Sequence, residues 1–323
     1  MKLKKKTVCC LVPALVCLCL AGCGGKVAQE NKEAYKTIGI RALEAGNYED
    51  AVEAFDNALA QANGKVTMDE VDICYYKARA LFEDGKKEEA LEVYNALLDL
   101  DKNLKDAYFL RGTVELSLGM GEEALADYKE AVRRDSRNIE LYVAMYDNLN
   151  EAGRTAEARE FLQEATEIPG QKATDYTLRG RAFMILGNTE GAREELNRAA
   201  EKDDPEAFLY LGELAGLEGN RDSAREYYSR YLSYHEEDAG ALNVLGCLAM
   251  ENEDYEQALG YFEQALLSCE SSMVDPKEIL RNRILTLEYL GRFEEAKEAM
   301  EEYESAYELD EELLREATFL ETR

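Results

Sequence analysis

The sequence predicts an all-α protein built as an array of about eight helical hairpins. Three observations support this fold class: a composition that favours helices, a period of about 34 residues, and glycines between paired apolar segments. The 323 residues include four prolines, 22 glycines and no tryptophan, with Ala, Leu, Glu, Lys and Arg abundant. Because 46% of the residues are hydrophobic, the chain can bury a continuous core, which argues against disorder.

The N-terminal segment, residues 1–22, is expected to be a targeting signal outside the fold. Four lysines between residues 2 and 6 precede an uncharged apolar stretch at residues 7–20. Residues 20–23 then read Leu-Ala-Gly-Cys, which resembles the lipobox of bacterial lipoproteins. That resemblance implies that the Cys23 thiol carries a diacylglycerol and that the signal is cut just before it. A transmembrane anchor and a plain secretory signal are the alternatives, but the stretch is shorter than a span of about 20 residues.

The charge of the chain limits its partners. The formal net charge is −29, and loss of four lysines with residues 1–22 leaves 34 basic against 67 acidic residues, or −33. Such a surface argues against nucleic acid and against direct attraction to an anionic membrane. We therefore expect a membrane-anchored lipoprotein on the extracytoplasmic face, held by the lipid on Cys23 and a short flexible tether at residues 23–31. Whether the cell has one membrane or two stays open.

A repeated frame organises the rest of the chain. Around Ala51, fixed distances separate Tyr35, Gly39, Gly46, Tyr48, Phe55 and Ala58. The frame recurs around Ala90, Ala124, Ala158, Ala192, Ala224, Ala258 and Ala296. The intervals are 39, 34, 34, 34, 32, 34 and 38 residues. A single hairpin cannot bury its apolar face, so neighbouring copies must stack.

This frame resembles the tetratricopeptide repeat (TPR), which has small residues at positions 8, 20 and 27 and large ones at 4 and 24. In the third copy Tyr108, Gly112, Ala124, Tyr128 and Ala131 match it, and the resemblance covers about 290 of the 301 residues after the signal. It implies a right-handed superhelical α-solenoid.

The elements are expected in the following order. The array of residues 32–323 should have repeats near 32–65, 71–104, 105–138, 139–172, 173–204, 205–238, 239–272 and 277–307. Glycine should close the turn at Gly46, Gly85, Gly119, Gly153, Gly187, Gly219 and Gly291. Asp204-Pro205 and Asp275-Pro276 should open the sixth and eighth repeats. A helix over residues 310–320 should cap the array.

Residues suited to catalysis or metal binding are scarce. One histidine is present, and Cys74, Cys247 and Cys269 remain after the signal without a CxxC pair. We expect isolated apolar thiols, with a Cys247–Cys269 bridge as the alternative. No catalytic residue, metal, cofactor or small-molecule substrate is predicted, and the protein is expected not to be an enzyme.

Binding is the remaining function. In the TPR family, the first helix of each repeat lines a concave groove that binds peptides or partner helices. The matching residues here are Tyr75, Arg79, Phe82, Phe109, Thr113, Leu116, Thr177, Arg181 and Met184. Some of them are apolar at positions that the repeat core does not need, although packing against neighbouring helices is an alternative use for them. The lysine and asparagine pattern that binds chaperone tails is absent, because Ile40, Tyr76 and Leu110 stand at its positions.

The sequence thus predicts a lipid-anchored, extracytoplasmic, non-catalytic TPR scaffold or adaptor that binds a protein or peptide partner in its groove. Two alternatives stay open: a TPR lipoprotein subunit of a secretion or envelope-assembly machine, and a cell-wall glycan-binding protein. Twenty tyrosines permit glycan binding, whereas the absence of tryptophan makes it less attractive.

Overall fold

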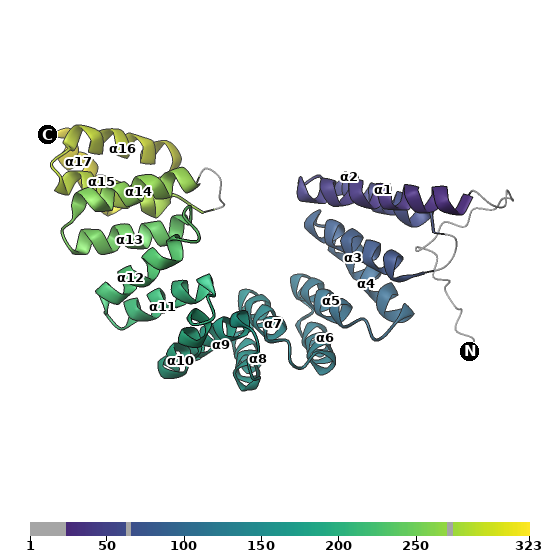
Figure 1. Ribbon diagram of the computed structural model, residues 1–323. Helices are drawn as coiled ribbons and strands as arrows, with labels where there is room; N and C mark the ends of the chain where they lie inside the picture. The colour runs from purple at the N-terminus through teal and green to yellow at the C-terminus, as the bar shows by residue number, and fades with distance from the viewer. Residues whose placement is uncertain (1–23, 63–65, 270–273) are drawn as a thin grey trace. The chain divides into compact units, whose positions relative to one another are not determined.

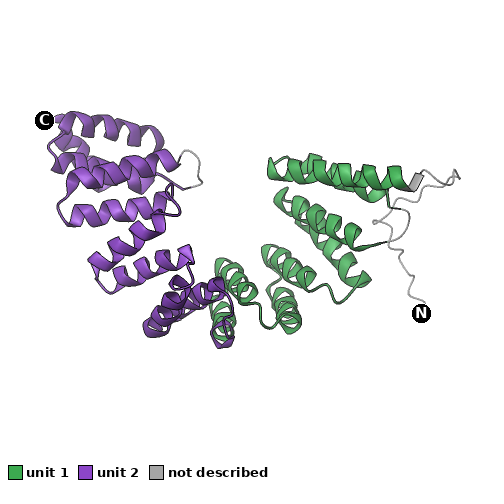
Figure 2. Cartoon of the chain, in the orientation of Figure 1, with its two compact units in different colours: residues 1–164 green, residues 165–323 purple. Residues whose placement is uncertain are grey.

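The computed structural model describes residues 24–62, 66–269 and 274–323, which form seventeen α-helices and no strand (Figure 1). The predicted all-α fold of helical hairpins is therefore confirmed. Among these described helices, none combines the length and the apolar character needed to cross a membrane. The predicted signal and Cys23 lie outside the described residues. The chain divides into two compact units, residues 1–164 and 165–323, with the boundary inside one helix (Figure 2).

Unit 1 is a stack of hairpins. The second helix of each packs on the first helix of the next: α2 on α3, α4 on α5, and α6 on α7. The helices are α1 (Gly24–Glu44), α2 (Tyr48–Ala60), α3 (Met68–Glu83), α4 (Lys87–Leu100), α5 (Lys105–Ser117), α6 (Gly121–Arg134), α7 (Ile139–Glu151) and α8 (Thr155–Glu167), the last of which crosses the boundary between the units.

Unit 2 repeats this arrangement and ends in a single helix. Its helices are α9 (Ala173–Leu186), α10 (Thr189–Ala200), α11 (Pro205–Leu217), α12 (Arg221–Leu232), α13 (Ala239–Glu251), α14 (Tyr255–Cys269), α15 (Lys277–Tyr289), α16 (Phe293–Ala306) and α17 (Glu311–Glu321). The solitary helix α17 packs on α16 and buries Leu313 and Leu320. Asp310 caps it by accepting hydrogen bonds from the N–H groups of Glu312 and Leu313 at 3.0 and 2.9 Å. It is the expected capping helix.

The turns inside the hairpins depend on glycine. All seven glycines predicted to close them have φ between 69° and 83°, a left-handed conformation that costs other residues energy. In the third hairpin, Gly119 donates to the carbonyl of Leu116 and Met120 donates to the carbonyl of Glu115. The last carbonyls of the first helix are thereby paired, and the chain reverses within three residues.

The two helices of a hairpin meet at a glycine that faces a bulky side chain sixteen residues later. A Cβ built on Gly246 would lie 2.4 Å from Cε1 of Phe262, and one on Gly39 would lie 2.6 Å from Cε1 of Phe55. Both phenylalanines are fully buried, as their position in the repeat predicts. The same relation joins three further pairs, Gly112 with Tyr128, Gly180 with Leu196 and Gly212 with Tyr228.

Three sequence predictions need correction. The expected flexible tether is absent from the described residues, because α1 begins at Gly24 and is supported by an i,i+4 ion pair from Lys26 to Glu30. Helix α15 starts one residue after Pro276, although the Asp275 carboxylate still accepts from the Lys277 N–H at 3.1 Å. The alternative of a Cys247–Cys269 bridge is wrong, because both thiols are free.

A buried charged cluster lies between α5 and α6. Arg111 donates two hydrogen bonds to Asp127, at 2.6 and 2.8 Å. Glu115 is 6% exposed, its Oε2 atom has no hydrogen-bond partner, and its Oε1 atom lies 3.8 Å from Nε of Arg111. Burial, together with the nearby Asp127 carboxylate, raises the pKa of Glu115 to about 7.

The glycine contact predicts opposite effects for two substitutions in the seventh hairpin. Gly246→Ala should destabilise the protein by about 1–3 kcal/mol, because the new methyl group collides with Phe262. Gly260→Ala, on α14, is the matched control: its Cβ would meet nothing within 4 Å, so it should stabilise the helix by about 0.5–1 kcal/mol. Urea unfolding measures both. Equal effects of the two substitutions would contradict this account of the contact.

The Glu115 carboxyl predicts a pH dependence of stability. Its folded pKa, about 7, exceeds the ordinary value of 4.5, so the folded state holds the proton more tightly. The stabilisation is complete below pH 4.5 and is lost as the pH rises to 7, with a slope of at most about 1.4 kcal/mol per pH unit for one group. Glu115→Gln should reduce the slope of stability against pH in urea unfolding measured between pH 4.5 and 7.5, and the part that remains includes Glu288, whose pKa burial also raises to about 7. The exposed control Glu92→Gln should keep the whole slope. An unchanged slope in Glu115→Gln would show that another group titrates.

Candidate functional site

A cavity of about 320 Å³ opens in unit 1 between the first helices of the second and third hairpins. Helix α3 supplies most of its wall, α5 supplies the opposite wall, and α4 contributes one ring. The lining residues are Asp72, Tyr75, Tyr76, Arg79, Phe82, Glu83, Tyr94, Leu110, Thr113 and Val114. It brings together four of the nine predicted groove residues, namely Tyr75, Arg79, Phe82 and Thr113.

The repeat frame explains why α3 presents this wall. The six lining residues of α3 follow one another at intervals of three, one, three, three and one, which places them on one stripe of the helix. The adjoining face of α3 carries Val71, Cys74, Ala78 and Leu81, which are buried in the hairpin core. Tyr75 and Phe82 lie where the two faces meet, so they pack against this core as well as lining the cavity.

Aromatic rings form the floor of the cavity. The ring of Tyr75 lies 6.3 Å from that of Tyr94, and Tyr76 stacks on Phe55 at 5.8 Å. Tyr94 is only 2% exposed, and burial raises its pKa well above the ordinary range. Burial, with help from the Asp106 carboxylate, raises the pKa of Tyr75 to about 12. Both phenols therefore stay neutral at physiological pH, and Tyr75 supports hairpin packing as well as lining the cavity.

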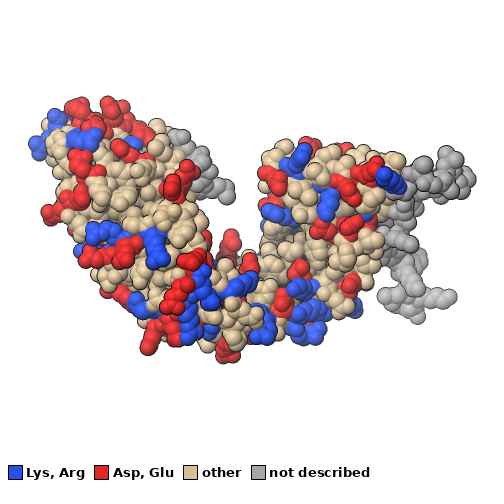
Figure 3. Space-filling model, in the orientation of Figure 1, with Lys and Arg blue, Asp and Glu red and all other residues tan. Residues whose placement is uncertain are grey.

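Arg79 is the cation of this cavity and stands at its rim. It is exposed and makes no hydrogen bond or ion pair with the part of the chain that the structure describes. Asp72, by contrast, is already paired with Lys36. Glu83 lies four residues from Arg79 and makes no ion pair with any described residue. Acidic and basic side chains are otherwise interspersed over the visible face of both units (Figure 3).

Two of the three predicted residues of α5, Phe109 and Leu116, lie outside the cavity. Phe109 is half-buried, and its ring stacks on Tyr128 at 5.7 Å, so it takes part in hairpin packing. Leu116 is also half-buried and does not line the cavity. Thr113 lines it, and its hydroxyl is held by Asn148, whose amide donates to it at 3.0 Å. For Phe109, the alternative of packing against a neighbouring helix describes the structure better than a free binding side chain.

The three predicted residues of α9 belong to unit 2. Thr177 is 4% exposed, and its hydroxyl donates to Oδ2 of Asp204 at 2.7 Å, so it positions the start of α11 instead of facing a ligand. Met184 packs against the core of unit 2. Arg181 is half-buried. Burial raises the pKa of the nearby Glu213 carboxyl, and the Arg181 guanidinium offsets part of this rise.

Sequence reasoning missed several lining residues. Tyr94 was not among the predicted groove residues, and the structure shows that its ring reaches the cavity floor. Leu110 and Val114 come from the side of α5 that turns toward the second hairpin. The one available signal was the density of aromatic residues in α3, where Tyr75, Tyr76 and Phe82 occur within eight residues.

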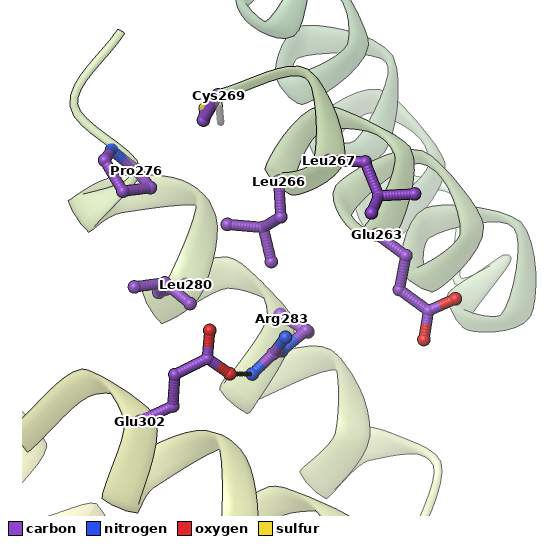
Figure 4. Close-up of a pocket in the computed structure, with 8 residues that line it drawn as sticks. All are labelled: Glu263, Leu266, Leu267, Cys269, Pro276, Leu280, Arg283 and Glu302. Atoms are coloured by element: carbon purple, nitrogen blue, oxygen red, sulfur yellow. Dashed lines mark hydrogen bonds and ion pairs between the residues drawn. The ribbon is translucent and has the colours of Figure 1, made fainter. Parts of the chain in front are cut away.

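A second cavity, of about 560 Å³, lies in unit 2 among α14, α15 and α16. Figure 4 shows Leu266, Leu280 and Cys269 around it, with Arg283 and Glu302 forming an ion pair of 2.5 Å on one side. Its lining cation is thus already neutralised, unlike Arg79. Residues 270–273, which follow Cys269, lie outside the described residues. The cavity in unit 1 is therefore the better candidate for ligand binding.

Comparison with known proteins agrees with the repeat frame. The sequence pattern of the tetratricopeptide repeat family matches residues 37–105, 177–241 and 217–276, and a second pattern of that family matches residues 105–138. Among curated relatives, the TPR repeat-containing protein YpiA of Bacillus subtilis is 25% identical over 251 residues, which cover 76% of this chain and 56% of YpiA. The DnaJ protein P58IPK homolog A of Oryza sativa is 30% identical over 150 residues, covering 42% of this chain and 32% of the relative. The matched segments therefore cover 32% of one relative and 56% of the other.

Solved structures show the same fold at lower identity. Cut9 in the APC/C Cut9–Hcn1 hetero-tetramer superposes with a TM-score of 0.54 at 16% identity, over 84% of this chain and 52% of that one. A tetratricopeptide repeat protein from Parabacteroides merdae gives a TM-score of 0.53 at 16% identity, over 80% of this chain and 99% of that one. With the repeat pattern matched over more than half of its length and the hairpins described above, this chain belongs to the tetratricopeptide repeat family.

Proposed function

We propose that this protein is a non-catalytic scaffold that binds a protein or peptide partner through the cavity between α3 and α5, while a lipid on Cys23 holds it at the extracytoplasmic face of a membrane. The observation that carries the binding role is the apolar, aromatic cavity with the unpaired Arg79 at its rim. Such a combination of an apolar anchor pocket and an available guanidinium is characteristic of binding hot spots.

The chemistry of the cavity defines the kind of segment that fits. Tyr75, Phe82 and Leu110 offer an apolar surface for one large side chain. Arg79 can pair with a carboxylate of the partner or stack on an aromatic ring. Since the rest of the chain is strongly acidic, basic residues outside the anchor would speed the encounter.

The anchoring half of the proposal comes from the sequence. The basic start, the apolar stretch and the Leu-Ala-Gly-Cys ending at residues 20–23 together resemble a lipoprotein signal. Two acyl chains are sufficient for stable attachment, because each buried methylene contributes about 0.8 kcal/mol. The lipid then overcomes the repulsion expected between an acidic protein and an anionic membrane.

Photo-crosslinking in intact cells tests the class of partner. A benzoylphenylalanine at position 82 places the reactive group in the cavity, and one at Leu217, which is 78% exposed in unit 2, is the control. A protein captured from position 82 and not from position 217 supports the scaffold, whether or not it belongs to an envelope machine. Capture of muropeptides from position 82 would favour the glycan-binding alternative.

Substitution of Arg79 should weaken binding without affecting the fold. Arg79→Ala removes an exposed side chain that makes no contact needed for stability, so the melting temperature should stay within about 2 °C. Affinity for the captured partner should fall by about 1–2 kcal/mol, measured by calorimetry. Arg41→Ala is the matched control, since Arg41 is also exposed and unpaired among the described residues but lies outside the cavity. An equal loss of affinity in both variants would reject this cavity as the site.

Substitution of Cys23 should abolish lipid attachment. In the lipoprotein class that the signal resembles, cleavage follows acylation, so Cys23→Ala should accumulate as uncut precursor. Labelling cells with radioactive palmitate measures the first step, and the mass of the protein measures the second. Cys19→Ala, inside the apolar stretch, should be acylated and cut normally. Palmitate at the wild-type level in Cys23→Ala would end the lipoprotein proposal.

A further inference from the structure

Three exposed apolar side chains lie at or beside the starts of α1 and α3, two helices of unit 1 that contact each other. Val27, in the first turn of α1, is 54% exposed, and Val66 and Met68, at the start of α3, are 53% and 69% exposed. Figure 1 shows that α1 and α3 both begin at the same edge of unit 1. We call Val27, Val66 and Met68 the leading edge.

Buried ionic contacts fix the two helix starts against each other. Nζ of Lys32 lies 2.7 Å from Oε1 of Glu70 and 3.5 Å from Oδ2 of Asp69. Lys32 and Glu70 are only 7% and 5% exposed, so this contact is part of the core. Glu70 also accepts from the backbone N–H of Thr67 at 2.8 Å, which closes the capping box of α3. These contacts therefore hold the starts of α1 and α3, which carry the leading edge, in fixed positions relative to each other.

The chain leaves no spacer between this edge and the proposed lipid. Helix α1 begins at Gly24, the residue that follows Cys23. At a rise of about 1.5 Å per residue, Val27 lies about 5 Å along the helix from Gly24, and Ile38 lies about 20 Å from it. An acylated Cys23 would therefore hold the first turn of α1 at the level of the lipid headgroups.

We propose that the leading edge rests in the interfacial layer of the bilayer when Cys23 is acylated, so that α1 rises away from the membrane and does not lie along it. This inference depends on the proposed lipid anchor and adds to it a defined orientation of unit 1. Val27, Val66 and Met68 would enter the boundary between headgroups and acyl chains, where apolar side chains of peripheral proteins insert.

The charges beside the edge fit a zwitterionic surface better than an anionic one. The side chain of Lys26 is 87% exposed, and its long stem can lie along lipid while the ammonium group stays in water. Glu30 and Asp69, whose side chains are 64% and 62% exposed, would stay at the aqueous rim. Neither positive nor negative charge prevails strongly beside the leading edge, so apolar contact and the acyl chains must supply the attachment to the membrane.

The absence of tryptophan from the sequence permits a direct test. Three full-length variants each carry one tryptophan: Val27→Trp, Met68→Trp and, as control, Ile38→Trp. Ile38 matches Val27 in exposure, at 54%, and lies on the same helix. The acylated proteins are reconstituted into phosphatidylcholine vesicles with or without brominated acyl chains, which quench tryptophan only on contact. Mass spectrometry verifies the acylation.

The proposal expects bromolipid to quench Val27→Trp and Met68→Trp at least threefold more strongly than Ile38→Trp. Met68→Trp decides the matter, because it is 45 residues from Cys23 in sequence and reaches the bilayer only if the edge faces it. Acylated protein in which Met68→Trp is not quenched would overturn the orientation and leave the anchor standing. Equal quenching of all three would also overturn it, since α1 would then lie flat. Mature protein without acyl chains would overturn both the anchor and the orientation.

Discussion

The fold depends on one contact that is repeated along the chain, in which a small residue of the first helix receives a large side chain sixteen residues later. Five hairpins place glycine there, and a methyl group on any of these glycines would overlap the facing side chain. The eighth hairpin has Ile284 and Met300 at these two positions, and both are buried in the same core cluster. This contact sets the distance between the two helices of a hairpin. The positive-φ glycine in the turn allows the chain to reverse so that the two helices can pack.

On α3, this contact leaves part of the first helix free to line the cavity. On α3, one side packs within the hairpin, and Ile73 and Ala80 pack against the preceding hairpin with no exposed surface. The remaining stripe carries Tyr75, Arg79 and Phe82, and it becomes a cavity only because α5 closes the other side. The cavity therefore requires two neighbouring hairpins, and its depth depends on how closely they stack.

The features predictable from sequence are those set by short-range geometry. The turns, the period and Phe55 and Phe262 in the core follow from residues close together in the repeat. Only four of the ten residues that line the cavity were predicted, because the lining depends in part on side-chain partners in the next hairpin. Thr177 shows this: its position matches the groove, yet a hydrogen bond to Asp204 of the next hairpin buries it. The start of α1 was missed because two glycines suggest flexibility, whereas the ion pair from Lys26 to Glu30 supports helix.

The terminal hairpins each have one face on which no further described hairpin stacks, and this face is covered at one end and exposed at the other. At the C-terminal end, α17 covers the last hairpin with Leu313 and Leu320, and Asp310 and Glu312 pair with Arg281 of α15. At the other end, Ala34 and Arg41 stand where Ile73 and Ala80 stand in the second hairpin, but they are exposed because no described hairpin precedes α1. Since a stack of repeats has a free face wherever stacking stops, an end without a cap must be polar enough for water or must lie against something else. On this face of α1 the charged Arg41 satisfies the first condition, whereas the apolar Val27 and Ile38, each 54% exposed, do not. Under the proposed lipid anchor, the leading edge meets the second condition by lying against the bilayer.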